Sequence, residues 1–274
     1  MVLVLGVKAH YNDVKTALKL SRSLELHEDL VDVNDEGLKK QADAFKIFDT
    51  DSIDSLSIHC PMTSKRGAFD LCCDGDEDEI ARRTLALGDS LAKYASPIVF
   101  VFHANGTTLD LNDHEKRKKV IADLANKVNA IAGADRRITI ENTTRRHWPN
   151  LLFAGIEDFS MLFESSEKRV GMTLDICHFF MEHLNEGYGK LEDLIESYDD
   201  KIFNIHISDM KFSKPKESEG TQIGEGDLDF DRVFDLLSDV SSDLKVNVIP
   251  EIRDGHKNNC AGFRTAVGRL KEYF

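Results

Sequence analysis

Short apolar segments rich in β-branched residues recur along the chain and alternate with longer segments in which apolar residues have helical spacing. This pattern predicts eight strands: Val2–Val7, Ser23–Leu26, Ser55–Cys60, Ile98–His103, Ile138–Asn142, Val170–Asp175, Ile202–Ile207 and Val246–Ile252. It predicts helices over Asp13–Leu20, Asp78–Tyr94, Asp113–Ile131, Leu191–Tyr198, Phe230–Leu237 and Gly262–Tyr273. Near-continuous apolar strands separated by amphipathic helices are typical of a parallel sheet covered by helices.

Eight such units in 274 residues indicate an α/β protein of the (β/α)8 TIM-barrel class, a parallel eight-stranded barrel surrounded by helices. A doubly wound open sheet is the alternative architecture. No linker rich in Ser, Gly or Pro interrupts the pattern, so residues 1–274 are expected to form a single domain. The longest irregular segment, Lys211–Gly226, follows the seventh strand and is expected to lie over the mouth of the barrel.

Composition narrows the possible functions. The chain is 41% hydrophobic and 31% charged, as in ordinary globular proteins. It carries 35 Lys and Arg against 49 Asp and Glu, and a net charge of −14 disfavours binding to a phosphate backbone. No apolar run is long enough to cross a membrane, and the first residues turn polar too early for a signal peptide, so a cytoplasmic location is expected. Five cysteines without CxxC spacing indicate neither a disulfide framework nor a thiolate metal site.

Ionisable residues occur where the apolar strands end. The positions are His59, His103, Glu141, Asp175, His206 and Glu251. In a (β/α)8 barrel the carboxyl ends of the strands meet at one face, which is where the active site lies. One histidine on an apolar strand is usually a hydrogen-bonded core residue, but six ionisable groups at equivalent strand ends indicate a functional site.

A divalent metal ion would explain this concentration of charge. Three carboxylates in one barrel mouth would repel one another and lose hydration unless a cation compensated them. Mixed imidazole and carboxylate ligands suit Zn, Mn, Co or Fe, whereas Mg and Ca prefer oxygen alone. The sequence therefore predicts a divalent metal cofactor.

The motifs in this sequence resemble the xylose isomerase-like TIM-barrel superfamily, which includes sugar phosphate isomerases and epimerases and the endonuclease IV or AP endonuclease 2 family. The resemblance runs from the second strand onward and is carried by SLELH, SIHCP, VFHANG, TIENT, LDICH, IHISD, GEGDLDF and PEIR. It implies that four residues hold the common metal: Glu141, Asp175, His206 and Glu251.

The resemblance also bears on further metals. In endonuclease IV a second metal shares the residue matching Glu141 and binds histidines that match His59 and His103, so the resemblance implies one metal ion with room for a second. A third metal binds a histidine matching His178 together with an Asp and a His just before the GEG segment. This sequence has Ser218–Thr221 there, without either residue, which disfavours nuclease chemistry.

The favoured function is a metal-dependent enzyme that isomerises or epimerises a small sugar or sugar derivative. Glu141 and Glu251 are the expected catalytic pair, one removing the proton next to a carbonyl group and the other returning it. His178 is expected to bind a second metal, to orient a substrate hydroxyl or to support a ligand. The expected substrate contacts are Arg253, Trp148 and Glu25, although Glu25 would equally well brace a neighbouring ligand.

The alternative function is an endonuclease IV-like, metal-dependent phosphodiesterase or AP endonuclease. A barrel that binds a metabolite without catalysis is disfavoured by the complete set of four metal ligands. The expected partner is a small carbohydrate-like molecule, not nucleic acid or a membrane. Barrels of this kind often pair through their outer helices, so a homo-oligomer is also an expectation.

Overall fold

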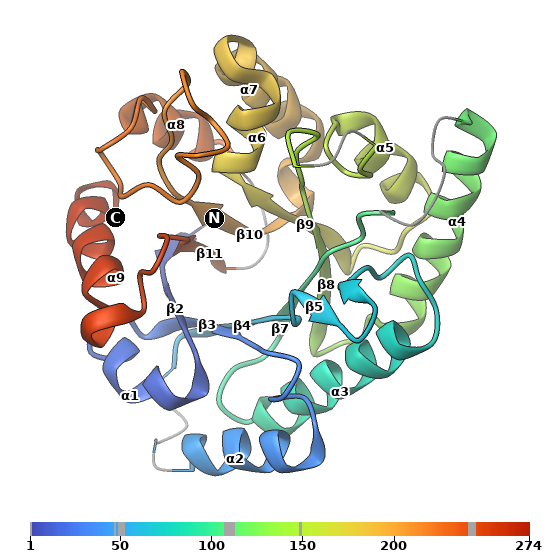
Figure 1. Cartoon of the computed structure of the whole chain (residues 1–274), viewed down its shortest axis with the longest axis vertical. Coiled ribbons are helices and arrows are strands. Elements are labelled where there is room, and N and C mark those ends of the chain that lie inside the picture. Colours follow the sequence, from blue (N-terminus) through green and yellow to red (C-terminus); the bar gives the residue numbers. More distant parts are fainter. Residues whose placement is uncertain (1, 47, 49–52, 107–112, 148–149, 241–244) are drawn as a thin grey trace.

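The computed structural model describes residues 2–46, 48, 53–106, 113–147, 150–240 and 245–274. Within them, parallel strands form one sheet that curves into a nearly closed barrel, and helices surround it (Figure 1). The nine strands of this sheet are β1 (Val2–Leu5), β2 (Val7–Ala9), β3 (Ser23–His27), β4 (Ser55–His59), β7 (Ile98–Phe102), β8 (Arg136–Glu141), β9 (Val170–Asp175), β10 (Ile202–Ile207) and β11 (Lys245–Pro250). The expected parallel α/β barrel is confirmed.

The barrel closes through its first strand, which is divided at Gly6. The segment before Gly6, β1, pairs with β11, and the segment after it, β2, pairs with β3. The Gly6 amide donates a hydrogen bond of 2.9 Å to the carbonyl of Val248. A Cβ atom at Gly6 would lie 2.5 Å from Cδ1 of Ile249, so this position has no room for a side chain. The two segments correspond to the single first strand that the sequence predicts.

The helices on the outside are α1 (Val14–Ala17), α2 (Asp35–Phe45), α3 (Asp76–Leu91), α4 (His114–Ile131), α5 (Ile156–Glu164), α6 (Ile176–His183), α7 (Gly187–Tyr198), α8 (Phe230–Leu237) and α9 (Lys257–Leu270). In α8 the buried residues are Phe230, Val233, Phe234 and Leu237, which is the spacing that predicted this helix. Every one of the eight predicted strands and six predicted helices has a counterpart, with ends shifted by a few residues.

Three helices were not predicted from the sequence. The α2 segment is polar and contains Gly37, so its apolar periodicity is weak. The α6 segment, ICHFFMEH, begins at the residue after β9 ends, so no Gly or Pro separates strand from helix in the sequence. In helix α5 the buried face includes the acidic residue Asp158, so apolar positions alone do not mark that face. Asp175 ends β9 and also caps α6, with its carboxylate accepting a hydrogen bond from the His178 amide.

The segment 211–226 is irregular, as expected, but it is held to the barrel. Asp209, just after β10, forms an isolated antiparallel bridge with Thr221. The Asp209 carboxylate accepts hydrogen bonds from the amides of Met210, Gly226 and Leu228, so both ends of the loop are fixed to one side chain. In the part of the chain that the structure describes, no helix has the length and apolar character required to cross a bilayer.

The packing between β9 and β10 gives a test of the fold. A Cβ atom at Gly171 in β9 would lie 2.3 Å from the carbonyl oxygen of Lys201 and 2.7 Å from the Phe203 ring. We expect Gly171→Ala to lower the free energy of unfolding by about 1–3 kcal/mol, the usual cost of overpacking. Urea unfolding followed by circular dichroism measures the change.

Gly189→Ala is the matched control. Gly189 lies in α7, and no atom lies within 4 Å of the position of an added Cβ. Alanine is the better helix former, so this variant should be as stable as the parent or up to about 1 kcal/mol more stable. Equal stabilities for the two variants would contradict the tight packing inferred at Gly171.

Candidate metal centre

The ionisable residues predicted at the strand ends converge at the carboxyl-terminal mouth of the barrel. His59, Glu141 and Asp175 are the last residues of β4, β8 and β9. His206 lies near the end of β10. His103 directly follows β7, and Glu251 directly follows β11. The parallel strands place these six side chains at one end of the barrel because their registers align across the sheet.

The four residues expected to hold the common metal form one group. One ligand atom each from Glu141, Asp175, His206 and Glu251 lies within 4.8 Å of all the others. Nδ1 of His206 lies 3.4 Å from Oε1 of Glu141 and 3.4 Å from Oε1 of Glu251. The Glu251 side chain is 23% exposed, while those of Glu141 and His206 are buried. Glu251 is therefore the member of this group that is most open to a substrate.

A second group shares Glu141. His59 and His103 direct their Nε2 atoms at Oε2 of Glu141, at 3.2 and 3.5 Å respectively. These three residues also have ligand atoms within 4.8 Å of one another. The two oxygens of Glu141 thus face different sets of imidazoles, which is the arrangement that a carboxylate shared by two cations would need.

The donor atoms fit a metal ion. Nδ1 of His206 and Nε2 of His103 are buried and make no hydrogen bond to the described residues, although both point at carboxylates. Hydrogen bonds on the other side fix two rings: His59 Nδ1 lies 2.7 Å from the Cys60 carbonyl, and His206 Nε2 lies 2.9 Å from the Glu25 carboxylate. Histidine ligands of metals are commonly oriented in this way. The unsatisfied nitrogens are the ligand atoms such an ion would take.

Burial and neighbouring charge set the protonation of the carboxylates. Burial raises the pKa of Asp175, and so do the nearby carboxylates of Glu251 and Glu141. The charge of His178 lowers the pKa, but the raising effects dominate and the pKa is about 7. For Glu251, burial also raises the pKa, but the charges of His206 and Lys8 outweigh burial and lower it to about 2. Glu251 is therefore ionised at neutral pH and available as a base.

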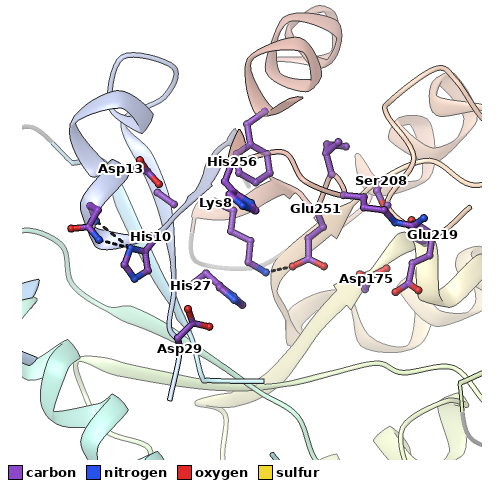
Figure 2. A pocket seen from close by; sticks show the side chains of 17 residues that line it. Lys8, His10, Asp13, His27, Asp29, Asp175, Ser208, Glu219, Glu251 and His256 are labelled. Carbon is purple, nitrogen blue, oxygen red and sulfur yellow. Dashed lines mark hydrogen bonds and ion pairs between the residues drawn. The ribbon is translucent and has the colours of Figure 1, made fainter. Parts of the chain in front are cut away.

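Lys8 is a site residue that the sequence reasoning did not identify. It lies in β2, and its Nζ forms an ion pair with Glu251 and lies 3.5 Å from Oε1 of Glu25 (Figure 2). Burial lowers the pKa of Lys8, but the charges of Glu251, Glu25 and Glu141 outweigh it, so the pKa stays above its usual value. The position of Lys8 directly after the predicted first strand, Val2–Val7, was the signal available in the sequence.

The residues expected to contact substrate have different positions. Glu25 is fully buried and hydrogen-bonds to His206, Asn204 and Ser57, so it braces a ligand instead of lining the cavity. Arg253 does line the cavity, but its guanidinium donates to the backbone carbonyls of Glu217 and Glu219. Trp148 lies outside the described residues.

A cavity of about 780 Å³ opens above the metal group (Figure 2). Its lining includes Lys8, His27, Asp175, Glu219 and Glu251, so charged groups of both signs face the same space. This volume lies within the usual range for small-molecule sites. Glu141 lies beneath this surface, buried among the imidazoles.

The barrel of this chain superposes on barrels of other solved structures. A 3-keto-D-glucoside 4-epimerase from E. coli superposes with a TM-score of 0.69 at 14% identity, covering 98% of this chain and 99% of that one. An IOLI protein with a binding zinc atom has a TM-score of 0.67 at 17% identity, with 98% and 99% covered. An AP endonuclease, family 2, from Brucella melitensis has a TM-score of 0.64 at 15% identity, with 96% and 97% covered.

At these identities the superpositions show a shared fold. The family model described as xylose isomerase-like TIM barrel matches residues 22–273, and the chain belongs to this family. No curated protein matches the sequence. The structural neighbours include sugar epimerases as well as the AP endonuclease.

Metal content tests the two groups separately. After reconstitution with Zn, Mn, Co or Fe, we expect Glu141→Ala to hold at least one equivalent less than the parent protein, because it removes a ligand from the four-residue group. His59→Ala should keep that equivalent, since His59 is not one of the four residues of the first group. Elemental analysis of the dialysed proteins measures both.

The metal content of the same variants also tests the group of His59, His103 and Glu141. An equivalent lost in His59→Ala would show that His59, His103 and Glu141 also hold an ion. A parent protein that binds no metal after reconstitution would contradict the metal centre itself.

Proposed function

We propose that this protein is a metal-dependent isomerase or epimerase that acts on a small sugar or sugar derivative. The observation that carries the proposal is the position of Glu251, an ionised carboxylate that belongs to the four-residue metal group and also lines the cavity. The superpositions on sugar epimerases support the same chemistry.

Glu141, Asp175, His206 and Glu251 would hold the metal. When bound, a divalent ion there would polarise the substrate carbonyl and its neighbouring hydroxyl, which makes the adjacent C–H bond more acidic. The proposal assigns the remaining steps to side chains of the barrel mouth.

Glu251 removes the proton from the carbon next to the carbonyl group. The C–H electron pair moves into a carbon–carbon double bond, and the carbonyl oxygen takes the negative charge. The Lys8 ammonium, beside Glu251 and on the cavity wall, is placed to attract that charge. Oxidation state is conserved overall, so the reaction needs no oxidant or reductant.

Glu141 returns a proton from the other side. Because Glu141 is ionised in its surroundings of imidazoles, it must first gain the proton that it delivers. A doubly protonated His59, with Nδ1 donating to the Cys60 carbonyl and Nε2 3.2 Å from Oε2 of Glu141, would supply it. Return to the opposite face of the same carbon gives the epimer. Return to the former carbonyl carbon gives the isomer, provided that the neighbouring hydroxyl group also passes its proton to the former carbonyl oxygen.

Solvent isotope exchange tests this mechanism before the substrate is known. The metal-loaded protein is incubated in D₂O with a panel of ketoses, and NMR detects deuterium at the carbon next to the carbonyl. We expect exchange with at least one ketose, and a rate about 10²–10⁴-fold lower in Glu251→Gln, the usual contribution of a general base.

Glu217→Gln is the matched control for this experiment, because Glu217 is an exposed residue of the 211–226 loop and the charge change is the same. It should exchange at the parent rate. Undiminished exchange in Glu251→Gln would overturn the assigned base.

Phosphodiester hydrolysis is the second candidate function, and the His59–His103–Glu141 group favours it. In that reaction a second metal would occupy this group, and two closely spaced ions would activate a water molecule and stabilise the leaving oxygen. The superposition on the AP endonuclease supports this alternative, whereas the net charge of −14 opposes binding to DNA.

Cleavage of abasic-site DNA decides between the two. We expect no incision by the metal-loaded parent protein, assayed on a labelled duplex and separated by gel electrophoresis. Incision that is lost in His59→Ala and kept in Glu217→Gln would replace the isomerase with the hydrolase.

A further inference from the structure

A third group of potential metal ligands lies at the rim of the cavity. It consists of His147, His178 and Glu219, whose ligand atoms lie within 4.8 Å of one another. Nε2 of His178 lies 2.9 Å from one oxygen of Glu219, and Nε2 of His147 lies 3.2 Å from the other. The three residues come from different parts of the chain: the loop after β8, helix α6 and the 211–226 loop.

The surroundings hold this group in place. Nδ1 of His178 lies 3.2 Å from the carbonyl of Asn142, which orients the ring and leaves Nε2 facing Glu219. The guanidinium of Arg253 donates to the backbone carbonyl of Glu219 at 2.6 Å, which fixes the loop at that residue. The rings of His147 and His178 lie 5.7 Å apart at 86°, so their nitrogens approach the carboxylate from different directions.

We propose that His147, His178 and Glu219 bind a divalent metal ion of the zinc, manganese, cobalt or iron type, separate from the ion at Glu141. Two imidazoles and one carboxylate form a ligand set that such ions accept, and that Mg and Ca, with their preference for oxygen, do not. Three protein ligands leave coordination positions open. Glu219 lines the 780 Å³ cavity, so the open positions face the space that would receive the substrate.

This ion would carry positive charge to the side of the cavity formed by the 211–226 loop. An anionic or hydroxyl oxygen of a bound molecule is the chemistry it would recognise. The sequence offered no such site, because Ser218–Thr221 lacks the Asp and His expected before the glycine segment. The structure places a different carboxylate, Glu219, there and brings His147 to it from the loop after β8.

In the absence of an ion, the same contacts would form an ion-pair link between two loops. Burial raises the pKa of Glu219, but its hydrogen bonds to His147 and His178 outweigh burial and hold the pKa well below its usual value. Stoichiometry distinguishes the two possibilities, since a link between loops needs no metal.

The test compares zinc stoichiometries. The full-length protein is stripped with a chelator, dialysed against Zn²⁺ and analysed for bound metal, together with Glu219→Gln and His147→Gln. Each variant is expected to hold one equivalent less than the parent. His178 is left intact because its Nδ1 also lies 3.6 Å from Asp175 and 3.8 Å from Glu141, so changing it would disturb the main centre.

Glu217→Gln is again the control, with the same charge change in the same loop, and it should bind as much zinc as the parent. Equal stoichiometry in the parent, Glu219→Gln and His147→Gln would overturn the site. Because the readout is a metal count, it stands whether or not the isomerase mechanism does.

Anomalous scattering at the zinc edge keeps the proposal testable if the variants do not fold. Crystals of the zinc-saturated parent should show a peak about 2 Å from Nε2 of His147 and Nε2 of His178, the usual Zn–N distance. A peak at the Glu141 centre with none between these two nitrogens would overturn the site.

Discussion

The arrangement of charge around Glu141 is the constraint on which the mouth of the barrel depends. Its carboxylate is buried, with His59 and His103 facing one oxygen and His206 and His178 facing the other. Asp175 and Glu251 lie close by, so negative charge is concentrated where water cannot screen it. Cations must balance this charge, and the structure provides imidazoles, Lys8 and ligand geometry for metal ions.

Two features of the fold position the ionisable groups at the mouth: the division of the first strand and the capping of α6 by Asp175. The division of the first strand at Gly6 lets one segment pair with β11 and the other with β3, and it places Lys8 in the second segment beside Glu251. Asp175 ends β9 and caps α6, which fixes His178 one turn later on the rim. The same backbone features that close the barrel therefore position the ionisable groups.

The site has two levels that differ in access. The lower level, around Glu141, is buried and braced by Glu25, which hydrogen-bonds to His206 and has no exposed surface. The upper level, with Glu251, Lys8 and Glu219, lines the cavity (Figure 2). In the proposed reaction, Glu251 would remove a proton at the upper level, and Glu141 would return one from the buried lower level.

The sequence by itself determined the barrel and most of the ionisable residues gathered at its mouth. Apolar period and length are local properties, and parallel strands bring their carboxyl ends together, so residues such as Glu141 and His206 could be assigned to one face. Helix α6 was missed because it begins directly after β9, with no Gly or Pro between them. Only the tertiary structure showed that Glu25 braces His206, that Lys8 pairs with Glu251 and that His147 meets Glu219. Those contacts join residues far apart in the sequence, so no periodic pattern predicts them. They depend on the geometry of the loops and on the closure of the barrel.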